Sequence, residues 1–388
     1  MYFLILSLLS DSDQRESESC LSRALFQVSN TLSSPHPKKI IHSIQAEVLI
    51  ANYFFLANRM LEGKYHLNTA VSLAAGARLQ TLRPWGASTL PSSSVDPVER
   101  GETINAFWMV YSMHNLWDTL GPTTAVFDRE DQSIELPWPM DMANYEQILE
   151  DGDPEAAKGR STVRDFLSGA SIGSSGNGSS LLAKCTRACI LFSHANSLAN
   201  ASASGKVNRI LLDPHNDASL EMISSTGQLR NLSTILDCFY SELPPLDLES
   251  SPSDLHTTAS VHMLTHAAMI RVHEGIDIVK YHNKSLATAR TAIGLLPAVN
   301  TLRQHSSDVV RAPVLTPVFG MLWGIIGRVL LREMGRLRQS WSRPAMVWAR
   351  LRETEKMLVE LMTSMERFSG HSPFMAYQLE KLREAMNY

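Results

Sequence analysis

Apolar residues before position 60 recur with the period of an α-helix, and this pattern constrains the fold more than any other feature of the sequence. Ile41, Ile44, Val48, Ala51 and Phe55 alternate at spacings of three and four, which places them on one face of a helix. A break at 62–63 is predicted next, followed by an alanine-rich helical pattern over 67–77. Small residues there would let two antiparallel helices pack closely as a hairpin.

Further helical patterns follow along the whole chain. Residues 104–111 are aromatic and apolar on most sides, so we expect a central, buried helix that stops at Gly121-Pro122. No alternation of apolar and polar residues with hairpin turns is visible. The sequence therefore predicts an all-α fold, an irregular multi-helix bundle of antiparallel helix pairs. The later helices are expected at 181–199, 220–243, 254–281, 285–303, 313–336, 344–368 and 373–386.

Composition along the chain suggests three segments. Residues 1–150 would form an N-terminal half, with the helical hairpin and the aromatic core helix. Residues 151–180 are rich in glycine and serine and cannot bury enough apolar surface to order themselves, so a flexible loop is predicted. Residues 181–388 would form a C-terminal helical half.

Charge and cysteine content exclude several classes of protein. The formal net charge is −4, whereas a free-standing nucleic-acid binder usually carries a basic excess. The four cysteines have neither the spacing of a disulfide framework nor that of a zinc cluster, so reduced thiols are expected. The apolar start at 1–10 lacks the basic region and cleavage site of a signal peptide, and the uncharged run at 313–327 is too short to span a bilayer. We predict no membrane association.

Metal and phosphate chemistry have only weak sequence support. Cys185 and Cys189, like His262 and His266, stand four residues apart and would share a helix face, but buried thiols and packed histidines explain them better than a metal site. An acidic cluster, Asp128, Glu130 and Asp131, falls in a loop and has no second motif of the kind a magnesium-dependent terpene cyclase needs. We predict no catalytic residue, no metal ligand and no cofactor in this chain.

Arginines and large aromatic residues each admit a structural and a functional interpretation. Arg328, Arg332 and Arg336 form a basic stripe, which a solvated helix face explains better than contact with DNA. Large aromatic residues fill cores more often than pockets, although either use fits the sequence. The candidates for an effector pocket or for the core are Trp108, Tyr111, His262, His266 and Trp323.

A series of short motifs runs through the chain in a characteristic order. The series begins with Ile44-Gln45-Ala46, Arg59 with Glu62-Gly63, and Ala70-Val71-Ser72-Leu73-Ala74, and continues with Glu99-Arg100, Ala106-Phe107-Trp108 and Leu136-Pro137-Trp138-Pro139. Later segments are 262–268 and 373–380. This succession resembles the regulatory, or middle homology, domain of fungal zinc-cluster transcription factors. The resemblance covers nearly the whole chain, but the six-cysteine DNA-binding cluster is absent.

The resemblance implies a nuclear, non-catalytic regulatory and effector domain that controls RNA polymerase II transcription and responds to a metabolite. Its expected partners are a small-molecule effector, the transcription machinery or other proteins, and a second copy of the chain. DNA and zinc would enter only through a cluster outside these residues, as in a truncated gene model of a regulator. Two alternatives stay open: an α-helical interaction scaffold without DNA binding, and an all-α enzyme such as a terpene cyclase.

Overall fold

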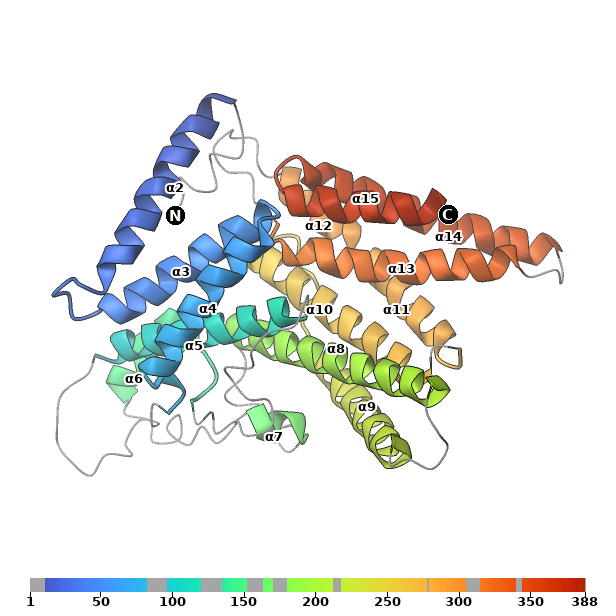
Figure 1. The fold of residues 1–388 in the computed structure, drawn as a ribbon, viewed down its shortest axis with the longest axis horizontal. Helices are drawn as coiled ribbons and strands as arrows, with labels where there is room; N and C mark the ends of the chain where they lie inside the picture. Colours follow the sequence, from blue (N-terminus) through green and yellow to red (C-terminus); the bar gives the residue numbers. More distant parts are fainter. Residues whose placement is uncertain are drawn as a thin grey trace. The chain divides into compact units, whose positions relative to one another are not determined.

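The computed structural model describes residues 11–81, 96–119, 134, 136–151, 163–169, 180–211, 218–277, 279–304, 315–339 and 344–387. Helices dominate these residues, and no β-strand occurs among them. Figure 1 shows the helices coloured along the chain. The predicted all-α class is confirmed. Of the Gly/Ser-rich segment predicted as a loop (151–180), only Asp151, 163–169 and Ser180 are among the described residues, and they include the short helix α7 (Val163–Leu167).

The chain divides into two compact units. Unit 1 comprises Met1–Phe54 and Arg59–Ile190, and unit 2 comprises Phe55–Asn58 and Leu191–Tyr388. Unit 1 contains α2 (Asp11–Thr31), most of α3 (Lys39–Leu56), α4 (Met60–Gly76), the short 3-10 helix η1 (Leu79–Thr81), α5 (Pro97–Asp118), α6 (Met142–Asp151) and α7; α8 (Leu181–Leu211) starts in this unit.

The helical hairpin predicted in unit 1 is present, but its turn is displaced from the predicted position. The break expected at Glu62-Gly63 was wrong, because both residues lie inside α4. The chain turns at 57–59 instead, where Asn58 takes the left-handed conformation with φ 59°. Asparagine tolerates this region better than most residues do. The α3 and α4 helices are then joined by a buried contact of 2.6 Å between Glu47 Oε2 and His66 Nδ1.

The predicted aromatic helix lies at the centre of unit 1. It is α5, and the side chains of Phe107, Trp108 and Val110 have no exposed surface. Asp96 caps the helix by accepting a hydrogen bond from the Val98 amide, with Pro97 in the first turn. The ring of Tyr145 on α6 lies against Gly101, at a place where a β-carbon would come within 2.4 Å of it. Glycine therefore allows α5 and α6 to approach this closely.

Unit 2 consists of the later helices, which match the predicted segments closely. They are α9 (Ala218–Ser241), α10 (Pro252–Asp277), α11 (His282–Ile293), α12 (Leu296–Gln304), α13 (Val318–Arg338), α14 (Pro344–Ser369) and α15 (Pro373–Asn387). The single helix expected at 285–303 is two helices, separated at Gly294-Leu295. In Figure 1 α13, α14 and α15 lie side by side.

Glycines on α13 determine how closely α15 can approach. A β-carbon at Gly320 would lie 3.2 Å from the Phe374 ring, and one at Gly327 would lie 2.7 Å from a Leu382 methyl group. Phe374 and Leu382 are themselves buried. The small residues of α13 therefore bring the two helix backbones together in the core of unit 2.

We predict that Gly327→Ala destabilises the protein even though alanine favours helix. The added methyl group would overpack the contact with Leu382, and such overpacking costs about 1–3 kcal/mol, which outweighs a helix-propensity gain of at most ~1 kcal/mol. Gly335→Ala in the same helix is the matched control, because no atom other than those of its chain neighbours and the nearby helix backbone lies within 4 Å of its β-carbon position. Urea unfolding should show a lower midpoint for the first variant and an equal or higher one for the second. Equal stabilisation by both variants would contradict this packing.

Candidate functional site

The five predicted effector residues are divided between the two units. Trp108 and Tyr111 belong to unit 1, whereas His262, His266 and Trp323 belong to unit 2. All five are buried, with exposed fractions between 0% and 7%. The sequence leaves two uses open for each group, packing in the core or lining a pocket.

In unit 1, Trp108 holds the irregular segment after α5 in place. Its indole Nε1 donates a hydrogen bond to the Pro137 carbonyl at 2.7 Å, and its ring stacks on Trp138 with 4.9 Å between centroids. Tyr111 packs edge-on against the Trp108 ring. Arg187 completes the stack, with its guanidinium 4.7 Å from the Trp138 ring centroid. These contacts give Trp108 and Tyr111 a packing role.

In unit 2, two histidines on α10 face Tyr240 of α9. His262 Nε2 lies 2.8 Å from the Pro244 carbonyl, whereas its Nδ1 and both ring nitrogens of His266 are buried without a hydrogen-bond partner among the described residues. The Tyr240 and His266 rings are 5.1 Å apart. Burial, with a smaller effect from His262, lowers the pKa of His266 to about 4. Both imidazoles are thus uncharged and weakly basic at neutral pH.

Trp323 has a different environment in the same unit. It has no exposed surface and lies between Phe319, 5.6 Å away, and Phe368, 6.1 Å away, measured between ring centroids. Its indole nitrogen is buried and has no partner among the described residues. The ring fills the space between α13 and α14, which is the use that aromatic residues most often have.

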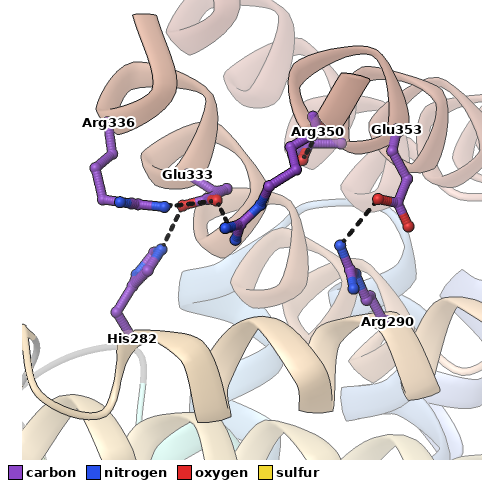
Figure 2. A network of polar contacts seen from close by, with 7 residues as sticks. His282, Arg290, Glu333, Arg336, Arg350 and Glu353 are labelled. Atoms are coloured by element: carbon purple, nitrogen blue, oxygen red, sulfur yellow. Dashed lines mark hydrogen bonds and ion pairs between the residues drawn. The ribbon is translucent and has the colours of Figure 1, made fainter. Parts of the chain in front are cut away.

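A buried acidic residue with several partners, Glu333 on α13, is shown in Figure 2. Its side chain has no exposed surface. Arg336 donates to both carboxylate oxygens at 2.8 and 2.9 Å, His282 of α11 lies 2.7 Å from Oε2, and Arg350 of α14 donates to Oε1 at 3.0 Å. One carboxylate therefore joins three helices.

The electrostatics of this cluster favour an ionised carboxylate. Burial alone raises the pKa of Glu333, but the hydrogen bonds from Arg336 and His282 outweigh burial and leave the pKa below its ordinary value. The neighbouring pair in Figure 2, Arg290 and Glu353, is 3.1 Å apart and exposed on both sides. A buried charge is tolerated only when it is paired, so the Glu333 cluster constrains how the helices pack. The Arg290–Glu353 pair is exposed to solvent and contributes little to stability.

Two arginines of the predicted basic stripe on α13 form ion pairs with acidic residues that have little or no exposed surface. Arg332 pairs with Glu274 of α10, whose carboxylate is 10% exposed and also accepts a hydrogen bond from Arg271 at 2.6 Å. Arg336 pairs with Glu333, as described above. Both arginines still contact solvent. The stripe is therefore part of the helix packing as well as an exposed face.

The cysteine pair and the acidic cluster contain other side chains with metal-ligating chemistry. Cys185 and Cys189 are free thiols in unit 1, where a hydrogen bond with Cys185 and burial raise the pKa of Cys189. Across the described residues, no group of three or more His, Cys, Asp or Glu side chains is arranged to hold a metal ion. Asp128, Glu130 and Asp131 lie outside the described residues.

Comparisons with known proteins add no relative. No protein-family model, curated protein or solved structure matches the chain. None of the helices in the described ranges is long and apolar enough to cross a membrane.

Sequence reasoning missed Glu333 as a central residue. The available signal was an acidic residue next to the basic stripe, on an otherwise apolar helix. Its partners are 51 residues away at His282 and 17 away at Arg350, and no local pattern indicates such pairing.

We predict that Glu333→Gln lowers the free energy of unfolding by about 2 kcal/mol. The neutral amide would leave Arg336 and Arg350 without their counter-charge; removing one partner of a buried pair costs about 3–5 kcal/mol, and we expect less here because both arginines are near half exposed. Glu353→Gln, in the exposed pair beside it, should cost at most ~0.5 kcal/mol. Denaturant unfolding followed by circular dichroism measures both. Equal effects of the two variants would contradict the assigned role of Glu333.

We predict that the protein loses stability as the pH falls from about 6.5 to 4 because buried histidines resist protonation. The pKa of His266 is about 4 when folded and about 6.5 when unfolded, so the unfolded chain binds the extra proton throughout this range. Above about pH 6.5 neither the folded nor the unfolded chain binds this proton, so the free energy of unfolding keeps its full value. Acidification to about pH 4 lowers the free energy of unfolding by roughly 2–3 kcal/mol. Urea unfolding at several pH values should show this loss, with a shallower slope for His266→Phe. An unchanged slope in that variant would contradict the assignment.

Proposed function

We propose that this chain is a regulatory and effector domain of a fungal transcription regulator, acting in the nucleus on RNA polymerase II transcription without catalysing a reaction. The proposal rests first on the ordered series of motifs that resembles the middle homology domain. The all-α architecture agrees with the fold which that resemblance implies.

The observation that carries the proposal is where the resembling motifs lie within unit 1. Ile44 of α3, the Ala70-Val71 pair of α4 and Phe107-Trp108 of α5 are all fully buried. The Leu136–Pro139 segment is joined to α5 by the hydrogen bond from Trp108 to Pro137 and by the stacking of Trp138. The residues that carry the resemblance are thus the ones that hold this unit together, which supports a shared fold.

A regulatory domain of this kind works only if its packing can change. An effector shifts the population of two conformations when it binds one of them more tightly than the other. Unit 2 offers a suitable element, because α11, α13 and α14 share the single carboxylate of Glu333. Such a polar cluster favours one discrete arrangement over a continuum.

A tethering experiment tests the proposal. The chain is placed between a heterologous DNA-binding domain and a strong activation domain in a yeast reporter strain, and the output is compared with that of the same fusion lacking the chain. We expect a change of at least about threefold, which corresponds to a coupling of ~0.6 kcal/mol.

Two tryptophan variants serve as controls in that experiment. Trp108→Ala should remove the effect, since truncating a buried tryptophan costs about 3–5 kcal/mol, whereas Trp348→Ala should retain it because Trp348 is 60% exposed. An unchanged reporter output from a folded, nuclear wild-type fusion would refute the proposal.

A further inference from the structure

One side of α14 is left uncovered by its neighbour α15. The two helices follow one another in the chain, joined by a turn at 370–372, and α14 has 26 residues against 15 in α15. At a rise of about 1.5 Å per residue, α14 is roughly 39 Å long and α15 roughly 22 Å. Figure 1 accordingly shows α14 continuing past the end of α15. The N-terminal part of α14 therefore has a side that α15 cannot reach.

A row of six residues runs along α14 at spacings of three and four, and we call this row the seam. Five of them are exposed and the last is half-buried; Trp348 is 60% and Val359 54% exposed. Such spacing aligns side chains as in the contact row of a coiled coil. The seam residues are Ala345, Trp348, Arg352, Glu355, Val359 and Met362.

The two charged residues at the centre of the seam are unpaired within the part of the chain that the structure describes. Neither Arg352 nor Glu355 forms an ion pair or a side-chain hydrogen bond with another described residue. Arg350, on a different side of the same helix, is paired with Glu333. The seam charges are therefore available to a second molecule.

The order of residues along the seam is complementary to the same order reversed. Two copies of α14 can lie antiparallel about a two-fold axis that passes midway between positions 353 and 354. Each seam residue then faces the one equally far from the axis on the other copy. Arg352 faces Glu355, and the ion pair occurs twice because the axis repeats it. Farther out, Trp348 faces Val359, and the small Ala345 faces the larger Met362.

The charges favour the antiparallel arrangement over a parallel one. In a parallel pair with matched register, Arg352 would face a second Arg352, and Glu355 a second Glu355. Like charges that face each other across an interface are repulsive. Only the reversed order places opposite charges together while keeping the apolar residues in contact.

We propose that two copies of the chain associate through the seam as an antiparallel two-fold dimer of α14. The occupant is a second copy because the surface that complements the seam is the seam itself. Tryptophan and arginine, both present here, are enriched among the residues that contribute most to protein interfaces. Six residues are few compared with the roughly 20–30 per side of a standard interface, so the dimer is weak and depends on concentration.

Sedimentation velocity of the full chain over roughly 1–200 μM tests the association. We expect the mass to rise from that of one chain to that of two across this range. Trp348→Ala should weaken the association at least about tenfold. Met346→Ala should leave it unchanged, because Met346 is 63% exposed but lies on a different side of the helix. A wild-type chain that stays monomeric throughout, or an equal loss in both variants, would overturn the inference.

Charge reversal tests the pairing itself. Arg352→Glu makes both central positions acidic and Glu355→Arg makes both basic, so each variant alone should associate at least about tenfold more weakly. An equimolar mixture of the two should recover association, because every acidic position then faces a basic one. Arg230→Glu, at an exposed position of α9, makes the same change of charge and should have no effect.

Two results of the charge reversal would contradict the proposal. One is association of both single variants as strong as that of the wild type, and the other is a mixture that stays monomeric although the wild type dimerises. Circular dichroism establishes that each variant is folded. In either case the seam would be left to a different occupant, such as another protein.

The dimer is independent of the regulatory function proposed above. In the tethering experiment the fused DNA-binding domain already holds the chain at the promoter, so Trp348→Ala should lose the dimer and still act on the reporter. If the reporter responds but the chain stays monomeric, the regulatory function stands and the dimer fails. If the chain dimerises through the seam but the reporter does not respond, the dimer stands and the regulatory function fails.

Discussion

The buried carboxylate of Glu333 is the interaction on which the packing of unit 2 depends. A carboxylate with no exposed surface is tolerated only when cations and hydrogen-bond donors surround it, and here they come from α11, α13 and α14 together. Close apolar packing already restricts how these helices can slide or rotate, and the carboxylate adds a directional requirement to it. The ion cluster favours one register of α11 and α14 against α13. The close contact between Gly327 and Leu382 similarly restricts the position of α15 on α13.

Most of the helices follow directly from the sequence because apolar periodicity is a local property. The boundaries that were wrong depend on backbone conformation instead. Gly63 suggested a break, yet it lies within α4, while Asn58 makes the turn by taking a left-handed φ that sequence only weakly indicates. The helix expected at 285–303 divides at Gly294-Leu295. The apolar pattern does not reveal this interruption, because Ala292 and Leu296 on either side of it are both buried.

The candidate sites were harder to predict because they depend on contacts between distant residues. Burial of Trp108, Trp323 and His266 follows from residue type and pattern, but the partners of their polar atoms do not. Trp108 reaches Pro137, 29 residues away, and Asn300 reaches Ser364, 64 residues away. Hydrophobic periodicity indicates which face of a helix is buried, without identifying the groups that meet on it. Tertiary structure is therefore needed to distinguish a filled core from a ligand groove.

The Glu333 cluster also sets how far the helices of unit 2 can move against one another. His282 belongs to α11 and Arg350 to α14, so a displacement of either helix against α13 would separate Glu333 from one of its partners. Separating a buried carboxylate from its partner is costly, so any ligand that favours a second arrangement must bind that arrangement more tightly by at least the same free energy. By reciprocity, a substitution that weakens the cluster would make the second arrangement easier for such a ligand to reach. The strength of the ion cluster therefore limits how far binding can shift the packing of these helices.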